Sequence, residues 1–139
     1  MNFARRIVID TGVLISAAIF PKSTPALAFR YAQSNFDLCF NDETYSEIEK
    51  VLLRSKFDSY ATNESRLYFL KKLKKSSFIF PSTSIKINDC PDPKDNKFLE
   101  LAFDVDAEII LASDKHLTDL HPWRGVPILT PAIFLSGVQ

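Results

Sequence analysis

The stretch RRIVID, Arg5 to Asp10, decides the fold class of this sequence. Its apolar triplet is β-branched and unbroken, without the alternation of a half-exposed strand, which is typical of a strand buried on both faces of a parallel sheet. An acid, Asp10, follows directly. The stretch AEIILASD, Ala107 to Asp114, has the same form, because a buried apolar strand again leads to an acid. Two strands of this kind predict a parallel sheet with carboxylates at one edge.

Helical patterns alternate with strand patterns along the rest of the chain. Three further short strands are predicted, at Phe36–Phe40, at Phe78–Pro81 and at Val126–Leu129, where Pro127 favours the edge of the sheet. Helices are predicted from Thr11 to the stop at Pro21, over Thr24–Ser34, after Asn41, from about Thr62, over Asp92–Val105 and from Thr130. The sequence therefore predicts an α/β fold, a three-layer α/β/α sandwich with a mostly parallel, roughly five-stranded sheet.

Apolar stripes predict which helix faces pack on the core. In the helix after Asn41 the stripe is Tyr45, Ile48 and Leu52, with Glu47 at its edge. In the helix from about Thr62 the expected inward residues are Leu67, Leu70 and Leu73, and in the Asp92–Val105 helix they are Phe98, Leu101, Ala102 and Val105. The lysines Lys71, Lys72, Lys74 and Lys75 are expected to form a solvated face at a helix end.

Length and composition are those of a single globular domain covering residues 1–139. The 139 residues are 46% hydrophobic and 24% charged, and no apolar run approaches the roughly 20 residues of a membrane span. The N-terminus passes directly into a strand without the apolar segment of a signal peptide. We expect no membrane association and a cytoplasmic location. Cys39 and Cys90 are expected to be buried or free thiols, because they lack metal-site spacing.

The acidic stretch NDCPDPKDNKFLELAF, Asn88 to Phe103, has two interpretations. As a helix start, it places Asp92 at the N-cap, Pro93 at N1 and Asp95 at N3, the outline of a capping box. Negative charge there also suits the helix dipole. Alternatively, the same helix start presents Asp95 to a site, and this stretch alone does not decide between the two roles.

The predicted topology brings four acids together. Ligands of parallel sheets bind outside the carboxyl ends of the strands, near the point where strand order reverses. Asp10 and Asp114 follow strands at that edge, and Glu47 and Asp95 lie in the first turns of helices that begin there. Asp89, Asp92 and Asp119 are further candidates at the periphery, with loop or cap roles as the alternative.

Clustered carboxylates predict a hard metal ion. They repel one another and raise one another's pKa values unless a cation lies among them. A set of oxygen ligands favours Mg²⁺ or Mn²⁺ over zinc, and such ions activate water for attack on phosphodiesters. The net charge of zero gives no global positive field for nucleic acids. Nearby basic residues are the predicted contacts to the phosphates of a nucleic-acid substrate: Lys94, Lys97, Lys115 and His116.

These residues resemble those of the PIN domain, especially the branch of VapC-like toxins in toxin-antitoxin pairs. IVIDTGVLISA is similar to the first PIN strand with its "DTN-V-L" motif, ETYSEIEKVLLRSKF to the Glu-bearing helix, and DPKDNKFLELA and ILASDKHL to the third and fourth acidic motifs. VPILTPAIFL is similar to the usual C-terminal ending. The similarity covers nearly the whole chain.

The resemblance implies a divalent-metal-dependent endoribonuclease. It implies that the ion or ions are held by Asp10, Glu47, Asp95 and Asp114, which also act as the catalytic residues. Asp92, Thr11 and Ser113 are then supporting residues. A small antitoxin partner and a homodimer are also implied.

The chain departs from the family pattern at four positions near the acids. Gly12 stands where the family often has Asn, Ala112 and Ser113 replace a common Thr-Gly pair, and His116 occupies an often acidic position. These departures keep a second hypothesis open, a catalytically degenerate PIN scaffold that binds nucleic acid or protein.

Other phosphate-processing classes of similar architecture fit less well. A haloacid-dehalogenase phosphatase needs a second Asp where this chain has Val13, and a receiver domain needs an acidic pair where Asp10 is flanked by Ile9 and Thr11. Only three glycines are present, and no Gly-rich phosphate loop is found. Cleavage of DNA flaps stays open, because metal chemistry does not itself select the 2′-hydroxyl.

Overall fold

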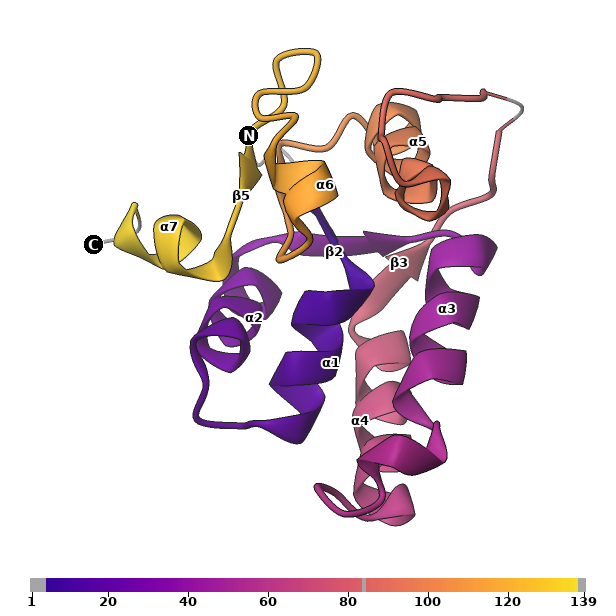
Figure 1. Cartoon of the computed structure of the whole chain (residues 1–139), viewed down its shortest axis with the longest axis vertical. Helices are drawn as coiled ribbons and strands as arrows, with labels where there is room; N and C mark the ends of the chain where they lie inside the picture. The colour runs from indigo at the N-terminus through magenta and orange to yellow at the C-terminus, as the bar shows by residue number, and fades with distance from the viewer. Residues whose placement is uncertain (1–4, 84, 138–139) are drawn as a thin grey trace.

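The protein is a parallel α/β sandwich in a computed structural model that describes residues 5–83 and 85–137. Within these residues, five strands form one sheet in the order β3-β2-β1-β4-β5, and each pairing is parallel. The strands are β1 (Arg6–Ile9), β2 (Asp37–Phe40), β3 (Ser77–Ile79), β4 (Ile109–Leu111) and β5 (Ile128–Leu129). The predicted fold class is confirmed (Figure 1). The expectation about a leader segment rests partly on residues 1–4, outside the described ranges.

Helices connect the strands and begin at capping side chains. They are α1 (Thr11–Ile19), α2 (Thr24–Asn35), α3 (Asp42–Leu52), α4 (Asn63–Lys75), α5 (Asn96–Val105), α6 (Lys115–Thr118) and α7 (Pro131–Ser136), with 3₁₀ turns η1 (Ser55–Phe57) and η2 (Pro93–Asp95). Ser23, Asn41, Thr62 and Thr130 each accept a backbone N–H of the first turn. No single described helix has the length and hydropathy of a membrane span, and α1 and α2 pass that test only as a pair bent by 106°.

The two faces of the sheet carry separate cores. Ile7 and Ile9 of β1 pack with buried residues of α1, α2, α3, α4 and α7, whereas Val8, between them, packs with α5 on the opposite face. Figure 1 shows these two helical layers on either side of the sheet. Both faces are covered, which explains why the β1 sequence is apolar without alternation. Cys39 and Cys90 are free and buried in the second core, as predicted.

The predicted inward face of α4 is partly wrong. Leu70 and Leu73 are buried as predicted, but Leu67 is 46% exposed, and Arg66 is turned inward with 1% exposure. The Arg66 guanidinium donates to main-chain carbonyls and to one carboxylate, which together hold the helix in this rotation: Leu52, Arg54, Thr62 and Asp58.

The strand order reverses between β1 and β4. The chain passes from β1 outward to β2 and β3, then returns to place β4 on the other side of β1. The segments that follow β1 and β4 therefore lie next to each other at the carboxyl edge, where Asp10 and Asp114 were predicted to meet. This edge is the expected ligand position in a parallel sheet.

Candidate active site

A pocket of about 330 Å³ opens at this edge of the sheet. The four predicted principal acids lie among its lining residues, which are Asp10, Thr11, Gly12, Glu47, Asp95, Phe98, Ser113 and Asp114. They come from the end of β1, from α3, from η2 and from the segment after β4. The structure thus brings together four carboxylates that are far apart in the sequence.

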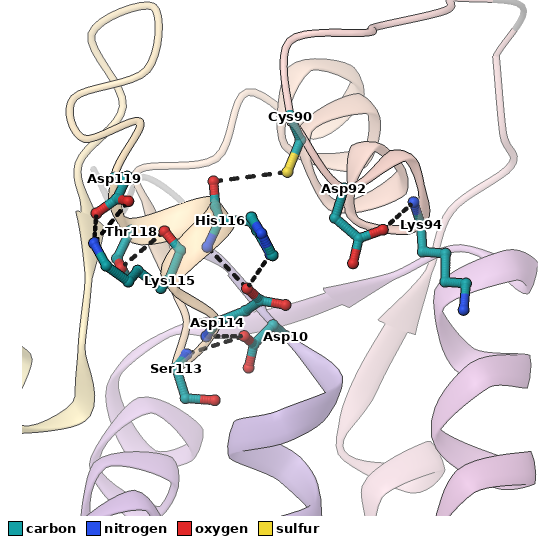
Figure 2. A network of polar contacts seen from close by, with 10 residues as sticks. All are labelled: Asp10, Cys90, Asp92, Lys94, Ser113, Asp114, Lys115, His116, Thr118 and Asp119. Atoms are coloured by element: carbon teal, nitrogen blue, oxygen red, sulfur yellow. Dashed lines mark hydrogen bonds and ion pairs between the residues drawn. The ribbon is translucent and has the colours of Figure 1, made fainter.

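Asp10 forms the floor of the pocket and joins the ends of β1 and β4. It is 2% exposed. Its Oδ1 accepts the Val13 N–H at 2.9 Å, and its Oδ2 accepts the N–H groups of Ser113 and Asp114 at 2.9 and 3.2 Å. Burial raises the pKa of Asp10 to about 6, although these three hydrogen bonds favour the charged form. Figure 2 shows Asp10 and Asp114 side by side below His116.

Glu47 reaches the pocket from α3 and is bound through both oxygens. Thr11 donates its hydroxyl to Oε1, and the Lys97 ammonium lies 2.7 Å from Oε2. Lys97 also donates to the Lys94 carbonyl at 2.5 Å. Lys97 is only 9% exposed, so in this structure its ammonium faces Glu47 rather than solvent.

Asp95 is free to face the pocket because another residue caps the turn. Asp92 is the N-cap of η2, and its Oδ1 accepts the Lys94 N–H at 3.1 Å. Asp95 sits at the junction of η2 and α5 and makes no side-chain capping bond. The buried Asn96 amide oxygen accepts the Cys90 N–H, which fixes the preceding loop against the helix start. Of the two roles proposed for this acidic stretch, Asp92 therefore caps the turn and Asp95 faces the pocket.

Asp95 and Asp114 are electrostatically opposed. Asp95 Oδ2 is buried and has no hydrogen-bond partner in the described part of the chain. Burial, followed by a shared hydrogen bond with Asp114 and the charges of nearby acids, raises the pKa of Asp95 to about 7. The hydrogen bond from Asp95 lowers the pKa of Asp114. Two adjacent ionised carboxylates repel each other, and a shared proton or a bound cation relieves this repulsion.

A group of side chains that could hold a metal ion includes two residues with other predicted roles. Ligand atoms of Asp92, Asp95, Asp114 and His116 all lie within 4.8 Å of one another. His116 belongs to this group because Asp114 caps its turn, accepting the His116 N–H at 2.8 Å, and the imidazole Nδ1 lies 3.2 Å from the same oxygen. A ligand at position 116 was not recognised in the sequence. The sequence did indicate that His116 lies near Asp114, because the side chain of a cap residue commonly binds the backbone N–H two positions later.

Three other predicted positions lie around this group. Ser113 lines the pocket, and a Cβ added at Gly12 would lie 2.6 Å from the Ser113 hydroxyl, so the two positions share one space. Lys115 is exposed and forms an ion pair with Asp119. Asp89, considered as a peripheral acid, instead accepts the Trp123 indole N–H at 2.8 Å.

A second hollow, of about 380 Å³, adjoins the acidic pocket and is mainly basic. Glu47 lines both. The remaining residues of this groove are Glu43, Ser46, Lys50, Val51, Arg54, Lys94 and Lys97. Lys50 and Arg54 were not predicted as contacts. Lys50 follows Glu47 at i+3 on α3, and Arg54 lies just beyond the end of that helix. We refer to this hollow as the basic groove.

A parallel sheet with an acidic pocket at its switch point defines the class of this protein. A family model described as PIN domain matches residues 6–116. The chain belongs to the PIN-domain family, and the predicted membership is confirmed.

Two known proteins show the extent of the likeness. The uncharacterized protein MJ1680 of Methanocaldococcus jannaschii is 32% identical over 119 residues, which cover 83% of this chain and 74% of that protein. A chain of the crystal structure of VapBC2 from Rickettsia felis, bound to a DNA fragment from their promoter, superposes with a TM-score of 0.60. That match covers 90% of this chain and 98% of the other at 9% identity, so it concerns the fold.

Proposed function

We propose that this protein is a divalent-metal-dependent endoribonuclease that hydrolyses RNA phosphodiester bonds, the toxin component of a toxin-antitoxin pair. One observation carries the proposal: Asp10, Glu47, Asp95 and Asp114 line a single pocket at the switch point of the sheet. Membership in the PIN-domain family supports the same chemistry.

The donor set fits Mg²⁺ or Mn²⁺. The partnerless Asp95 Oδ2 and the opposed carboxylates of Asp95 and Asp114 are the features that a cation would relieve. We assign Asp95 and Asp114 as the residues that hold it, with Asp92 and His116 within reach. When bound, the ion supplies a Lewis acid and lowers the pKa of water. The imidazole nitrogen favours Mn²⁺ over Mg²⁺, because Mg²⁺ binds oxygen ligands almost exclusively.

The remaining pocket residues position the reacting groups. Asp10 fixes the segment that carries Asp114 by accepting two of its N–H groups, so that the two acids keep their spacing. Thr11 supports Glu47 through its hydroxyl, and Ser113 supports Asp10 through its N–H. Asp10 and Glu47 line the rest of the pocket, where their carboxylates orient the attacking water.

We assign binding of the RNA backbone to the basic groove. Lys50, Arg54 and Lys94 are exposed along it, and the groove leads to the pocket through Glu47. Lys115 and His116, also predicted as contacts, are exposed next to Asp114 in the sequence and are further candidates for phosphate binding. Exposed ammonium and guanidinium groups hold phosphates without reading the base, so this surface supplies affinity more than sequence selection.

The same proposal includes partners and location. A solved structure with a similar fold is that of VapBC2, which favours a small antitoxin protein as the partner of this chain. We further propose a single PIN-like domain over residues 1–139, a homodimer, and action on cytoplasmic RNA.

Cleavage of end-labelled RNA with Mn²⁺ or Mg²⁺ tests the proposal. We expect EDTA to abolish cleavage and Asp95→Asn to lower it by at least about 100-fold. Loss of a residue that only hydrogen-bonds to a metal ligand typically lowers activity by about 10- to 100-fold, and loss of a ligand itself should have a larger effect. Glu49→Gln, an exposed acid on α3, is the control and should retain activity. DNA of the same sequence, cleaved equally well, would contradict the assignment of RNA as substrate.

The same assay separates the enzyme from the degenerate scaffold. A folded protein that binds RNA but cleaves it with neither metal ion would support the binding-module hypothesis. Unchanged cleavage by Asp95→Asn would remove this pocket from the chemistry.

A further inference from the structure

Lys97 is a buried ammonium at the junction between the acidic pocket and the basic groove. Its Nζ lies 2.7 Å from Glu47 Oε2 and 2.5 Å from the Lys94 carbonyl oxygen. Exposed lysines are mobile, but this side chain is 9% exposed, and the neighbouring Asn96 and Phe98 are buried as well. The ammonium is therefore held in one position by the start of α5.

The pocket is divided into two halves with different counter-charges. In one half, Glu47 is bound by the Thr11 hydroxyl and by Lys97, one partner on each oxygen. In the other half, Asp95 and Asp114 form a group with Asp92 and His116, which do not line the pocket, and the ligand atoms of these four residues lie within 4.8 Å of one another. Asp95 Oδ2 has no partner among the described residues. One half thus carries an ammonium, whereas the group around Asp95 and Asp114 contains no lysine or arginine among its members.

We propose that Lys97 takes the place of a second divalent cation, so that the pocket binds a single ion on the side of Asp95 and Asp114. This inference rests on the proposed function, because it assumes that the pocket is a metal site. Lys97 is here a positioning residue that fixes Glu47 and its charge. It was predicted from the sequence as an RNA contact, and its burial behind Glu47 favours this internal role instead.

The ammonium already bound to Glu47 favours one ion. Where two ions act on a phosphodiester, they lie about 3.5–4 Å apart and share carboxylates between them. Here the carboxylate that would complete the second position is Glu47, and an ammonium already binds it. A divalent ion at that position would either displace the Lys97 ammonium or lie next to its positive charge. Lys97 is already part of the chain, so its binding to Glu47 does not require an ion to be captured from solution.

Counting bound Mn²⁺ tests this inference without any activity measurement. The free ion is measured by electron paramagnetic resonance during titration of the wild type, Lys97→Met, Lys97→Arg and Lys94→Met. Lys94→Met is the matched control, because it removes a neighbouring exposed ammonium. Circular dichroism verifies that each variant is folded, and Lys97→Gln replaces Lys97→Met if that variant does not fold.

We expect one Mn²⁺ per chain in the wild type, in Lys97→Arg and in Lys94→Met, and two in Lys97→Met. Two ions in the wild type would overturn the inference but leave the proposed function intact. One ion in both the wild type and the folded Lys97→Met or Lys97→Gln would also overturn it, because Lys97 would then be structural only. No bound ion in the wild type would overturn the inference and the proposed metal site together.

Discussion

Arg66 and Lys97 are both buried basic side chains, but their partners differ in kind. Arg66 donates mainly to the main-chain carbonyls of Leu52, Arg54 and Thr62, and its one carboxylate partner, Asp58, is largely exposed. Lys97 donates to one carbonyl and to the carboxylate of Glu47, a residue of the acidic pocket.

This difference separates a structural cation from a functional one. Main-chain carbonyls do not exchange one cation for another, and Arg66 joins three of them, so it holds together the segment between α3 and α4. A pocket carboxylate can exchange one cation for another. The partners of a buried charge, more than its burial, therefore indicate whether it belongs to the fold or to the site.

Removing Arg66 should have the largest effect on stability. In Arg66→Met, the carbonyls of Leu52, Arg54 and Thr62 and the Asp58 carboxylate all lose the guanidinium, and we expect the free energy of unfolding to fall by about 2–4 kcal/mol. Urea unfolding followed by circular dichroism measures this loss. Asp58→Asn, which alters only the exposed partner, should cost less than about 1 kcal/mol. Equal losses in the two variants would contradict the structural role of the carbonyl contacts.

Removing Lys97 should cost less, and metal should reverse the cost. In EDTA, Lys97→Met loses a charge-assisted hydrogen bond to the partly exposed Glu47, and we expect a loss of about 1–2 kcal/mol. Mn²⁺ at about 100 times its dissociation constant should return at least about 2.7 kcal/mol by mass action. The thermal midpoint of each variant with and without Mn²⁺ makes the comparison. Mn²⁺ should raise the thermal midpoint of Arg66→Met by no more than it raises that of the wild type. A larger rise would contradict the distinction between Arg66 as a structural cation and Lys97 as a functional one.

Acidification should stabilise the metal-free pocket. The pKa values of Asp10 and Asp95, about 6 and about 7 in the fold, lie above the ordinary 3.8, so the folded chain binds more protons between these values than the unfolded chain does. The free energy of unfolding in EDTA should therefore rise as pH falls from about 7.5 to about 5. Asp95→Asn should reduce this rise. A steady decrease over the same range would contradict the described pocket electrostatics.

Exposed cations form a third group, which should affect binding but not folding. Replacing Lys50, Arg54 and Lys94 together by Gln removes three charges of the basic groove. We expect the slope of log affinity against log salt for single-stranded RNA to fall by about 2, with little change in stability. Filter binding at several salt concentrations, with catalysis blocked by EDTA, measures the slope. A triple variant of Lys71, Lys74 and Lys75 on α4 is the control.

The smallest effect concerns the space shared by Gly12 and Ser113. A methyl group at position 12 must push the Ser113 hydroxyl aside, since its Cβ would lie 2.6 Å away. Gly12→Ala alone should change stability by less than about 0.5 kcal/mol, because gained helix propensity offsets the contact. In a Ser113→Gly background it should stabilise by up to about 1 kcal/mol. Additive effects in urea unfolding would show that the two positions are independent.

The sheet and the meeting of the acids were predictable because they follow from local patterns and one topological rule. An unbroken apolar strand indicates burial on both faces, and parallel strands place their ends at one edge. Asp10 and Asp114 needed no further information. Glu47 and Asp95 needed only the prediction that their helices begin at the same edge.

The partners of these acids were not predictable in the same way. The inward turn of Arg66, with Leu67 outside, depends on carbonyls that become available only when α3 ends where it does. The burial of Lys97 depends on how α5 begins beside α3, and the approach of Asp92 and His116 to Asp114 depends on two turns meeting across the pocket. Sequence patterns show which elements form, but such contacts arise from their rotation and packing.

The most direct measurement is anomalous diffraction from a crystal of this protein soaked in Mn²⁺. We predict one manganese peak per chain, bound by Asp95 and Asp114, with the Lys97 ammonium still on Glu47. A pair of peaks bridged by Glu47, or no peak in the pocket at saturating Mn²⁺, would contradict the account.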